Sequence, residues 1–454
     1  MEFMGRRWVS LASTVVLMGG LLVAGCGDDK DSGSSAGAST GASATSTGSG
    51  AADTTAAAPA ASSSPLTPES SGVGDSEEAA SGTPIKVMVT APIDSPVGTA
   101  PGVQANVTAA FNDINAHGGV NGHPLKIVFC NNFNDPNKTA ACARQAVSEK
   151  VAAVIPYAAT QGPSLYPSLE KAGIPVIGAL PSTQPDWTSK VAYPISAGIS
   201  QMTLASGLQL KAHGADSVGG MMIDIPSAHV QESLIKRGAQ IAGLKFTTAV
   251  YHPATAADVS AQVQKLVSAG AKAITFVDTT AATVAAVKAA RQLGGNGMLF
   301  QQNAQSLDEG LFSGLGSDGG GLLVTAGLPP ETATRQFPGI KLWRDELDAA
   351  KQAGVKDTDT KGSSQAAWIA AHALAIAAQK VKGSVTAASL TKALDDTEDM
   401  DLLGLLKWTP GQGPKEFPRL NSGTIYFWVA KDGGYVIDPK MPDPVDIFAK
   451  AGLR

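Results

Sequence analysis

The stretch AFNDINAHGGVNGHPLKIVFC, residues 110–130, contains the signal that decides the predicted fold. Apolar residues in its first part recur at the spacing of one helix face, and we expect a helix over Pro101–His117. Gly118–Gly119 supplies the positive φ that a helix end needs, and Asn121–Gly122 is typical of a turn. The apolar run Leu125–Cys130 then predicts a strand that runs back beside an earlier one. This order indicates a compact βαβ connection, in which the glycines serve the chain geometry and hold no phosphate.

The rest of the folded chain alternates apolar, β-branched runs with alanine-rich helical runs. The runs that predict strands are Ile85–Thr90, Leu125–Cys130, Ala152–Pro156, Ile174–Ala179, Ser217–Ile223, Lys245–Val250, Ala273–Val277, Met298–Gln302 and Leu322–Ala326. The runs that predict helices include Asn137–Glu149, Ser227–Ala242, Ala257–Ala269, Ala281–Leu293, Ala333–Ala353 and Ser363–Val381. The strand candidates are almost continuously apolar, as expected when helices cover both faces of a sheet. The sequence therefore predicts an α/β fold with parallel sheets.

Two segments near the end of the chain have other patterns. The apolar part of Ser363–Val381 is too short and too rich in alanine to cross a bilayer, so we expect a buried helix. GTIYFWVAKDGGYVID predicts two strands around the turn Asp432–Gly434. A hairpin is therefore expected close to the C-terminus.

The first residues have the pattern of a secretion signal. Arg6 and Arg7 precede the apolar segment WVSLASTVVLMGGLLVAG, which ends on small residues before Cys26. The pentapeptide LVAGC resembles a lipobox, where lipoproteins are lipidated on cysteine and cleaved before it. The alternative is a transmembrane anchor, but the apolar run is short for a span of roughly 20 residues and an anchor leaves the cysteine unexplained. We expect residues 1–25 to be a signal peptide and Cys26 to carry the lipid that anchors the chain outside the cell membrane.

Residues 26–83 have the composition of a disordered tether. After Cys26 they are almost wholly Gly, Ala, Ser, Thr, Asp and Pro, which cannot bury enough apolar surface to fold. Residues 84–454 exceed what one hydrophobic core usually serves, so two domains are expected. The net charge of −5 is mild, and no basic patch is interleaved with aromatic residues. Nucleic acid is therefore not an expected partner.

Two cysteines remain in the folded part, at the ends of CNNFNDPNKTAAC. Outside the cytosol, Cys130 and Cys142 are expected to form a disulfide that joins the end of a strand to the following helix. On the loop-entropy model such a bond contributes about 3 kcal/mol to stability. The alternative is a pair of separate buried thiols.

No motif in the sequence indicates an enzyme. The six histidines show no metal-binding spacing such as H-E-x-x-H, and no P-loop is present. GLGSDG, residues 314–319, fits the letters of G-x-G-x-x-G but precedes a strand instead of a helix, so it predicts no dinucleotide site. GSSAG, residues 33–37, fits G-x-S-x-G with no strand or helix around it. We expect no enzymatic activity, no cofactor and no metal site.

The segment AFNDINAHGGVNGHPLKIVFCNNFNDPNKTAACARQAV closely resembles the extracytoplasmic solute-binding proteins of branched-chain amino-acid ABC transporters. In that family, a signature of the form IN..GGVNG with a later DP pair follows the first strand. KVAAVIPYAATQGPSLYPSLEKAGIPVIGALPST resembles the third and fourth strands of the family with their ligand-bearing loops. The resemblance covers residues 84–454, with the spacing of the signature kept.

The resemblance implies a type I periplasmic-binding fold, in which two doubly wound parallel-sheet lobes joined by three crossovers close on a solute. Lobe one is expected over 84–200 plus 326–424, and lobe two over 201–325 plus 425–454. The implied function is that a monomer binds a small polar solute, an amino acid or a related carboxylate or amide, and delivers it to an ABC permease in the membrane. The alternative is a ligand-sensing lipoprotein coupled to a signalling partner, because one fold serves both roles.

Loops after the lobe-one strands carry the first binding candidates, because open parallel sheets bind ligands at the carboxyl ends of their strands. The candidates are Ser95, Val97, Ala159, Thr160, Leu180 and Ser182. Ala159 and Thr160 match family positions whose backbone N–H and hydroxyl hold a solute carboxylate. Leu180 and Ser182 match the opposing backbone and hydroxyl contacts. Hydroxyls and free amides suit an anion because they donate several hydrogen bonds, and the alternative for each serine or threonine is a helix cap or turn.

Lobe two departs from the amino-acid-binding pattern. Family members often have an acidic residue after the strand that here ends at Gln302, but QQNAQS contains no carboxylate. An aromatic lid expected after Asp224 falls near Ser227, where no aromatic residue stands. Asp278 is another source of negative charge, unless it caps the helix that begins near Thr280. We therefore expect these four residues, Asp224, Ser227, Asp278 and Gln302, on the lobe-two side of the cleft, with the partner of a solute ammonium left open.

Overall fold

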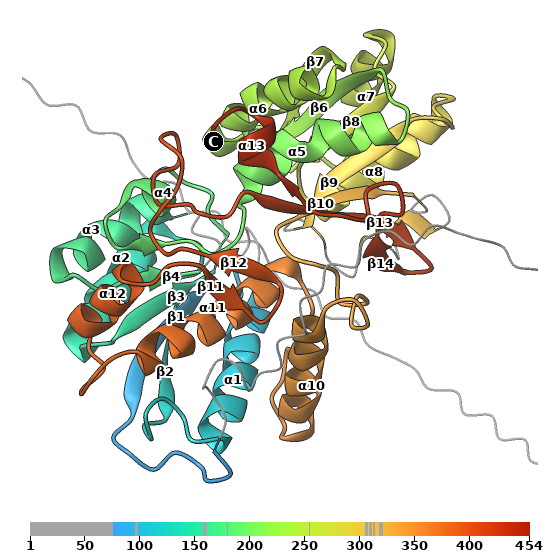
Figure 1. Cartoon of the computed structure of the whole chain (residues 1–454). Coiled ribbons are helices and arrows are strands. Elements are labelled where there is room, and N and C mark those ends of the chain that lie inside the picture. The colour runs from blue at the N-terminus through green and yellow to red at the C-terminus, as the bar shows by residue number, and fades with distance from the viewer. Residues whose placement is uncertain are drawn as a thin grey trace, which may run out of the picture. The chain divides into compact units, whose positions relative to one another are not determined.

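A computed structural model describes the fold for residues 76–95, 99–157, 161–178, 180–253, 255–304, 307, 311, 314–316 and 321–454 (Figure 1). These residues belong to the compact unit Ser62–Arg454. The predicted signal peptide, Cys26 and most of the predicted tether lie outside the described residues.

One sheet contains parallel strands in the order β2-β1-β3-β4-β5. Its strands are β1 (Ile85–Ala91), β2 (Leu125–Asn131), β3 (Ala153–Pro156), β4 (Val176–Ile177) and β5 (Ala192–Tyr193). Successive residues of a strand face opposite sides of its sheet. Val87 and Val89 accordingly face the core beneath α1 (Pro101–Ala116) and α11 (Gly362–Gln379), with α10 (Pro338–Gln352) packed against α1. Met88 packs on the other face beneath α2 (Pro136–Glu149) and α3 (Gly162–Ala172). This two-sided burial explains the continuous apolar run of β1.

The second sheet has the order β14-β13-β10-β9-β8-β6-β7, with β15 paired to β13. Its strands are β6 (Ser217–Ile223), β7 (Lys245–His252), β8 (Ala273–Val277), β9 (Leu299–Asn303), β10 (Leu323–Ala326), β13 (Thr424–Lys431), β14 (Gly434–Ile437) and β15 (Val445–Asp446). The strands from β6 to β10 are parallel, and β13 joins β10 antiparallel. Its helices are α5 (Ile199–Ala212), α6 (Pro226–Ala242), α7 (Ser260–Ser268) and α8 (Thr280–Gln292). α5 and α6 pack on one face, and α7 and α8 pack on the other (Figure 1).

The chain passes between the two sheets three times: after β5, after β10 and before β13. The predicted α/β architecture of two doubly wound sheets is therefore confirmed. The short elements near these passages are α4 (Pro185–Thr188), α12 (Ala387–Asp395), β11 (Met400–Leu402), β12 (Leu406–Trp408) and α13 (Ile447–Lys450). The residue boundaries proposed for the two lobes stay a prediction, because both sheets belong to one compact unit.

The connection from α1 to β2 has the predicted form. Gly119 has a φ of 62°, and a Cβ there would lie 2.4 Å from the carbonyl oxygen of His123, so only glycine fits. The Asn115 side chain then joins the helix to the strand, because it accepts from the Leu125 N–H at 2.7 Å and donates to the Leu125 carbonyl at 2.9 Å. Asn115 and Gly119, which belong to the IN and GG pairs of the sequence, therefore fix the point at which β2 begins.

Some elements begin or end at residues other than those predicted. α10 begins at Pro338, five residues after its predicted start, because a residue before proline is disfavoured in the helical region. β4 comprises only Val176–Ile177, because Gly178 turns the chain with a φ of 82°. The predicted hairpin is present, with β13 and β14 paired antiparallel around Asp432 and Gly433.

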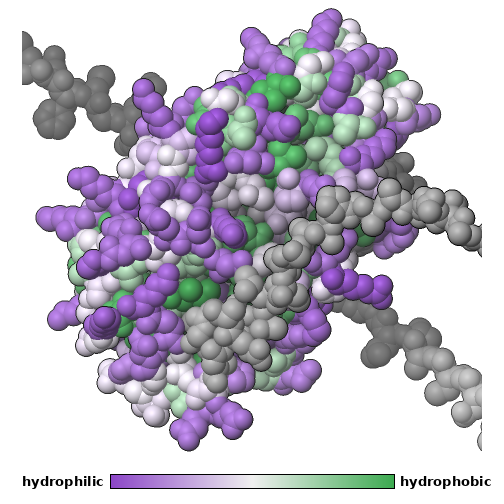
Figure 2. Space-filling view, viewed as in Figure 1, coloured by the Kyte–Doolittle hydropathy of each residue, from purple (hydrophilic) through white to green (hydrophobic). Residues whose placement is uncertain are grey.

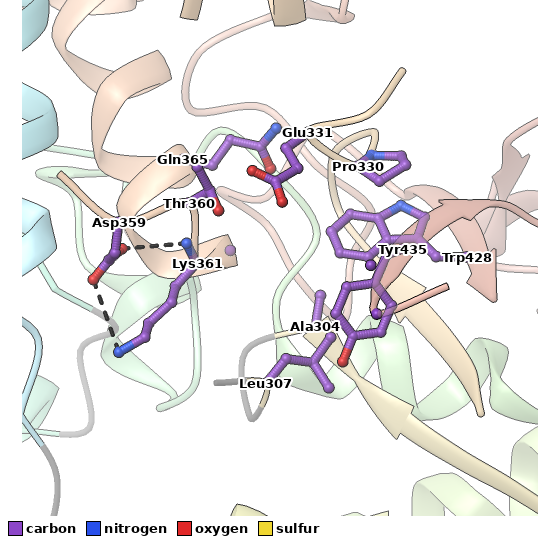
Figure 3. Close-up of a pocket in the computed structure, with 13 residues that line it drawn as sticks. Ala304, Leu307, Pro330, Glu331, Asp359, Thr360, Lys361, Gln365, Trp428 and Tyr435 are labelled. Atoms are coloured by element: carbon purple, nitrogen blue, oxygen red, sulfur yellow. Dashed lines mark hydrogen bonds and ion pairs between the residues drawn. The ribbon is translucent and has the colours of Figure 1, made fainter. Parts of the chain in front are cut away.

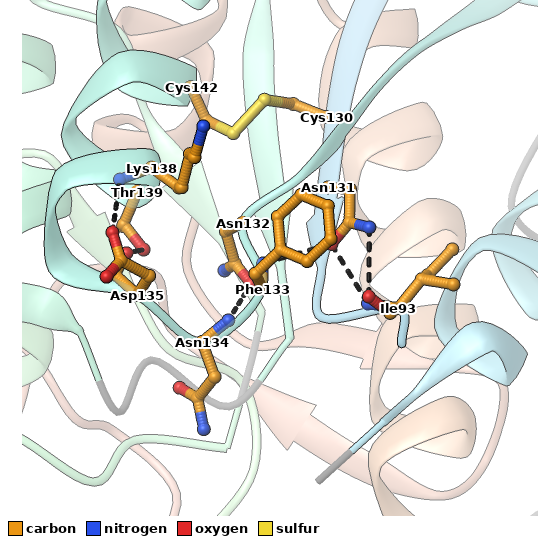
Figure 4. The surroundings of a disulfide bond; sticks show 10 residues. All are labelled: Ile93, Cys130, Asn131, Asn132, Phe133, Asn134, Asp135, Lys138, Thr139 and Cys142. Atoms are coloured by element: carbon orange, nitrogen blue, oxygen red, sulfur yellow. Dashed lines mark hydrogen bonds between the residues drawn. A yellow bond between two sulfur atoms is a disulfide. The ribbon is translucent and has the colours of Figure 1, made fainter. Parts of the chain in front are cut away.

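The predicted disulfide is present between Cys130 in β2 and Cys142 in α2 (Figure 4). The two Cα atoms lie 5.7 Å apart, within the usual range for a disulfide. Asp135 begins α2 as its N-cap, where its side chain accepts from the Lys138 N–H at 2.8 Å. The cap and the disulfide together hold α2 at the end of β2.

The viewed face of the molecule is mostly hydrophilic, with hydrophobic residues in small separate patches (Figure 2). The large apolar side chains that are exposed include Phe133, Ile225 and Val230. Among the described residues, no helix has both the length and the apolarity needed to cross a membrane.

Candidate functional site

One asparagine side chain holds the chain beyond the carboxyl end of β1. Asn131 accepts from the Ile93 N–H at 2.9 Å and donates to the Ile93 carbonyl at 3.0 Å (Figure 4). Ser95 follows within the described residues, whereas Val97 lies outside them. Asn131 at the end of β2 therefore fixes the backbone at Ile93, where the first predicted binding loop begins. A solute contact at Ser95 stays a prediction.

Two further predicted loops follow β3 and β4. Ala159 and Thr160 lie outside the described residues. After β4, a Cβ on Gly178 would lie 2.3 Å from the Cβ of Ala370, so the chain passes very close to α11. Leu180 is buried just beyond this contact. The approach to α11 therefore places the start of the third loop in the interior of the protein.

Asp186 organises the loop that carries Ser182. One oxygen, Oδ2 of Asp186, accepts from the Ser182 N–H at 2.9 Å, the Thr183 N–H at 2.6 Å and the Thr183 hydroxyl at 2.9 Å. Burial raises the pKa of Asp186 to about 6, although hydrogen bonds from Thr183, Ser182 and Tyr166 act to lower it. The Ser182 hydroxyl lies 3.5 Å from the Leu180 carbonyl, at the limit of a hydrogen bond. The Ser182 N–H is thus already used, and the hydroxyl is the group that this residue can offer a solute.

Asp278 is buried in a pair with His252. The Asp278 Oδ2 lies 2.5 Å from the His252 Nε2, and its Oδ1 accepts from the Thr279 N–H at 2.8 Å. Burial raises the pKa of Asp278, and the His252 contact lowers it. Thr279 is the N-cap of α8, since its hydroxyl accepts from the Ala282 N–H, so the alternative that Asp278 caps this helix is wrong. Both oxygens of Asp278 have partners within the protein, and a contact with a solute ammonium stays a prediction.

Gln302 lies next to Asp278. Its Nε2 donates to the Asp278 carbonyl at 3.4 Å and to the Thr283 hydroxyl at 3.1 Å, while its Oε1 accepts from the Asn303 N–H at 3.0 Å. The structure therefore brings these two predicted residues together, within a buried polar network at the ends of β8 and β9.

Asp224 lies on the surface after β6. Its Oδ1 lies 2.8 Å from the His229 Nε2, and both side chains are exposed. The His229 ring stacks on Tyr251 with ring centroids 4.3 Å apart. The side chain of Ser227 is outside the described part of the structure. The stacking of His229 on Tyr251 was not expected from the sequence, and a role of Asp224 and Ser227 in the cleft stays a prediction.

A cavity of about 190 Å³ lies between the second sheet and the start of α11, a helix that packs on the first sheet (Figure 3). Its lining comes from the ends of β9 and β10, the start of α11 and the hairpin of β13 and β14: Ala304, Leu307, Pro330, Glu331, Asp359, Thr360, Lys361, Gly362, Gln365, Trp428, Gly433, Gly434 and Tyr435. None of the predicted binding residues that the structure describes lines it. Leu180 lines an adjoining narrow hollow that shares Ala304, Gly362, Gln365 and Trp428 with the cavity.

The cavity wall before α11 is anchored to α1. The Asn106 side chain donates to the Asp359 carbonyl at 3.0 Å and accepts from the Trp343 Nε1 at 2.7 Å. A Cβ on Gly102 would lie 2.3 Å from the Asp359 carboxylate, so glycine permits this approach. Buried hydrogen bonds of this kind fix a segment in one position. These contacts attach the wall to α1, which packs on the first sheet.

The charged side chains of the cavity form two ion pairs. The Glu331 Oε2 lies 2.9 Å from the Arg344 Nη1, and the Lys361 Nζ lies 3.8 Å from the Asp359 Oδ2. The sequence contains one local signal for this site, because Trp428 and Tyr435 flank the DGG turn. Aromatic residues on both strands of a hairpin often share one face, but their position opposite Glu331 needs the tertiary structure.

The described residues contain no group of three or more His, Cys, Asp or Glu side chains placed to hold a metal ion. The polar groups at the strand ends are instead hydroxyls, amides and single carboxylates. Such groups bind an organic solute through hydrogen bonds.

Comparison of solved structures shows the same fold in other proteins. A possible leucine/isoleucine/valine-binding protein from Rhodopirellula baltica SH 1 has 16% identity and a TM-score of 0.67, covering 79% of this chain and 97% of that one. A solute-binding protein of an ABC transporter from R. palustris, in complex with 4-hydroxybenzoate, has 20% identity and a TM-score of 0.65, covering 78% and 95%. A fatty acid ABC transporter substrate-binding protein from Thermomonospora curvata has 17% identity and a TM-score of 0.67, covering 85% and 97%. At these identities the likeness establishes the fold.

Comparison of the sequence with curated proteins found no match. The family model described as periplasmic binding protein matches residues 84–418, most of the folded chain. The proteins of this family are binding proteins that work outside the cytoplasm, in agreement with the type I fold of two parallel-sheet lobes. This chain belongs to the periplasmic binding protein family.

Proposed function

We propose that this chain captures a small carboxylate-bearing solute between its two lobes and delivers it to the permease of an ABC transporter. The observation that carries the proposal is the cavity between the second sheet and the start of α11, because α11 packs on the first sheet and a site shared by two lobes can close on a solute. Two of the similar structures support a carboxylate: one is a complex with 4-hydroxybenzoate and the other is named for fatty acids. Both of these ligands are carboxylic acids.

The residues assigned to the carboxylate are Thr160 and Ser182. Ser182 offers its hydroxyl, while Asp186 holds the loop through the Ser182 N–H at 2.9 Å. An anion beside a hydroxyl donor forms a charge-assisted hydrogen bond, which is stronger than a neutral one.

The solute can be identified directly. Protein purified under native conditions is expected to release a carboxylic acid that mass spectrometry can identify. Calorimetry with that acid should then show binding that is about ten- to a hundredfold weaker in Thr160→Ala and in Ser182→Ala. Unchanged affinity in both variants would place the carboxylate elsewhere.

The chain is proposed to work as a monomer held at the membrane by lipid on Cys26. Cys26→Ser should move the mature protein from the membrane fraction to the soluble fraction, and light scattering should give the mass of one chain. A permease partner predicts that loss of the protein abolishes uptake of the identified acid. Normal uptake with a lost transcriptional response would favour the sensing role instead.

A further inference from the structure

One wall of the cavity is aromatic and apolar. Trp428 and Tyr435 have ring centroids 5.8 Å apart and ring planes tilted by 45°. The Trp428 Nε1 donates to the Leu328 carbonyl at 3.1 Å, so its polar group is already used and its ring offers only apolar surface. Ala304 and Leu307 continue this wall (Figure 3).

The opposite wall is polar and has spare hydrogen-bonding capacity. Glu331 uses Oε2 for Arg344, and within the described residues its Oε1 has no hydrogen-bond donor. The Thr360 hydroxyl likewise has no hydrogen bond to any residue that the structure describes. Figure 3 shows Glu331 and Thr360 on the side of the cavity across from Tyr435. A ligand between the walls would meet an apolar surface on one side and acceptors on the other.

The volume sets the size of that ligand. A cavity of roughly 150 Å³ lined by apolar side chains accepts a benzene ring, and this one measures about 190 Å³. A short polar amino acid would leave the aromatic wall without a partner. A group of phenyl size would fill the space between Tyr435 and Thr360.

We propose that this cavity holds the body of the solute, and that the solute is a carboxylic acid with a phenyl-sized apolar group carrying a hydrogen-bond donor at its far end. The donor bonds to Glu331, and the apolar group lies against Trp428 and Tyr435. This inference rests on the proposed function, which assigns the carboxylate itself to the loops of Thr160 and Ser182. The same site would discriminate against acids without an apolar body.

The test is calorimetry on the mature chain with three probes: para-hydroxyphenylacetate, phenylacetate and acetate. Phenylacetate should bind at least about tenfold more tightly than acetate, because its phenyl group is transferred from water into the apolar cavity. Para-hydroxyphenylacetate should bind about tenfold more tightly again, because its hydroxyl donates to a carboxylate. Similar affinities for acetate and phenylacetate would overturn the inference and leave the proposed function standing.

Variants locate the two contacts. Thr360→Phe fills the cavity and should weaken both aromatic acids about tenfold or more while leaving acetate unchanged. Thr360→Ser, which keeps the hydroxyl and does not fill the cavity, is the matched control and should change each affinity little. Glu331→Met removes the acceptor and should abolish the preference for the hydroxylated acid. Arg344→Met breaks the same ion pair without altering the cavity wall and should keep that preference.

Each outcome separates the two proposals. Ser182→Ala should weaken all three acids, acetate included, because it acts on the carboxylate. Aromatic acids that bind equally well to Thr360→Phe would place the apolar group elsewhere and overturn the inference. If Glu331→Met still binds para-hydroxyphenylacetate more tightly than phenylacetate, Glu331 is not the acceptor for the hydroxyl of the solute. Failure of all three acids to bind would overturn both the inference and the proposed carboxylate function.

Discussion

Each sheet has a buried aspartate close to it, Asp186 in α4 and Asp278 directly after β8, but the two carboxylates are held by different partners. Asp186, beside the first sheet, accepts from two backbone N–H groups and one hydroxyl, all of them neutral. Asp278, at the end of β8, is paired with the ionisable ring of His252 at 2.5 Å. Burial raises the pKa of both carboxyl groups. We expect Asp186, which is held by neutral donors, to respond more to pH, and Asp278 to respond more to loss of its single side-chain partner.

The surroundings of the two aspartates differ in the same way. The first sheet has a disulfide, Cys130–Cys142, and the clamp of Asn131 on Ile93, neither of which depends on charge. The second sheet relies on the buried side chains of Gln302, His252 and Asp278. Removing one member of such a network leaves the others without partners. We expect side-chain deletions to affect lobe two more, and pH or reduction to affect lobe one more.

The largest expected effect is on the buried pair. Asp278→Ala leaves His252 buried without its partner and should lower the free energy of unfolding by about 3–5 kcal/mol in urea titration. The matched control is Asp224→Ala, which removes an exposed carboxylate from His229 and should change stability by no more than about 0.5 kcal/mol. Equal effects of the two substitutions would contradict the contrast between buried and exposed pairs.

The disulfide should have the next largest effect. Replacing both Cys130 and Cys142 by alanine should lower the free energy of unfolding by about 3 kcal/mol, because the unfolded chain regains loop entropy. A reducing agent should lower the stability of the original chain and have no effect on the double variant. A stability that is unaffected by reduction would show that the bond does not hold the end of β2.

The pH effect of Asp186 should be the smallest of the three. Its pKa is 3.8 for an ordinary aspartate and about 6 in the fold, so the folded state binds the proton more tightly. The resulting stabilisation is complete below pH 3.8 and is lost as the pH rises through about 6, a change of at most about 3 kcal/mol. Unfolding measured between pH 4 and pH 7 should show this loss in the original chain and less of it in Asp186→Asn. The raised pKa of Asp278 changes stability in the same direction, so only the difference between the original chain and Asp186→Asn reports on Asp186. Parallel curves of stability against pH for these two proteins would contradict the raised pKa of Asp186.

Most strands and helices could be predicted because their signals are local. The apolar runs of β6 and β8 match the structure residue for residue, and the glycines after α1 end the helix where expected. The partners of the candidate site residues were harder to predict, because pairs such as His252 and Asp278 are far apart in the sequence. β7 and β8 lie on either side of β6, and this order of strands brings their ends together. A pattern within one segment contains no information about that order.

The sequence by itself determined the alternation of elements, the parallel sheets and the disulfide partners. Each of these depends on periodicity, turn chemistry or spacing within a short segment. Only the tertiary structure decided that Glu331, Thr360 and Trp428 share one cavity. They come from segments after β10, before α11 and within β13, which meet because the chain passes repeatedly between the two sheets. Contacts of such long range are set by packing, and no local pattern of residues records them.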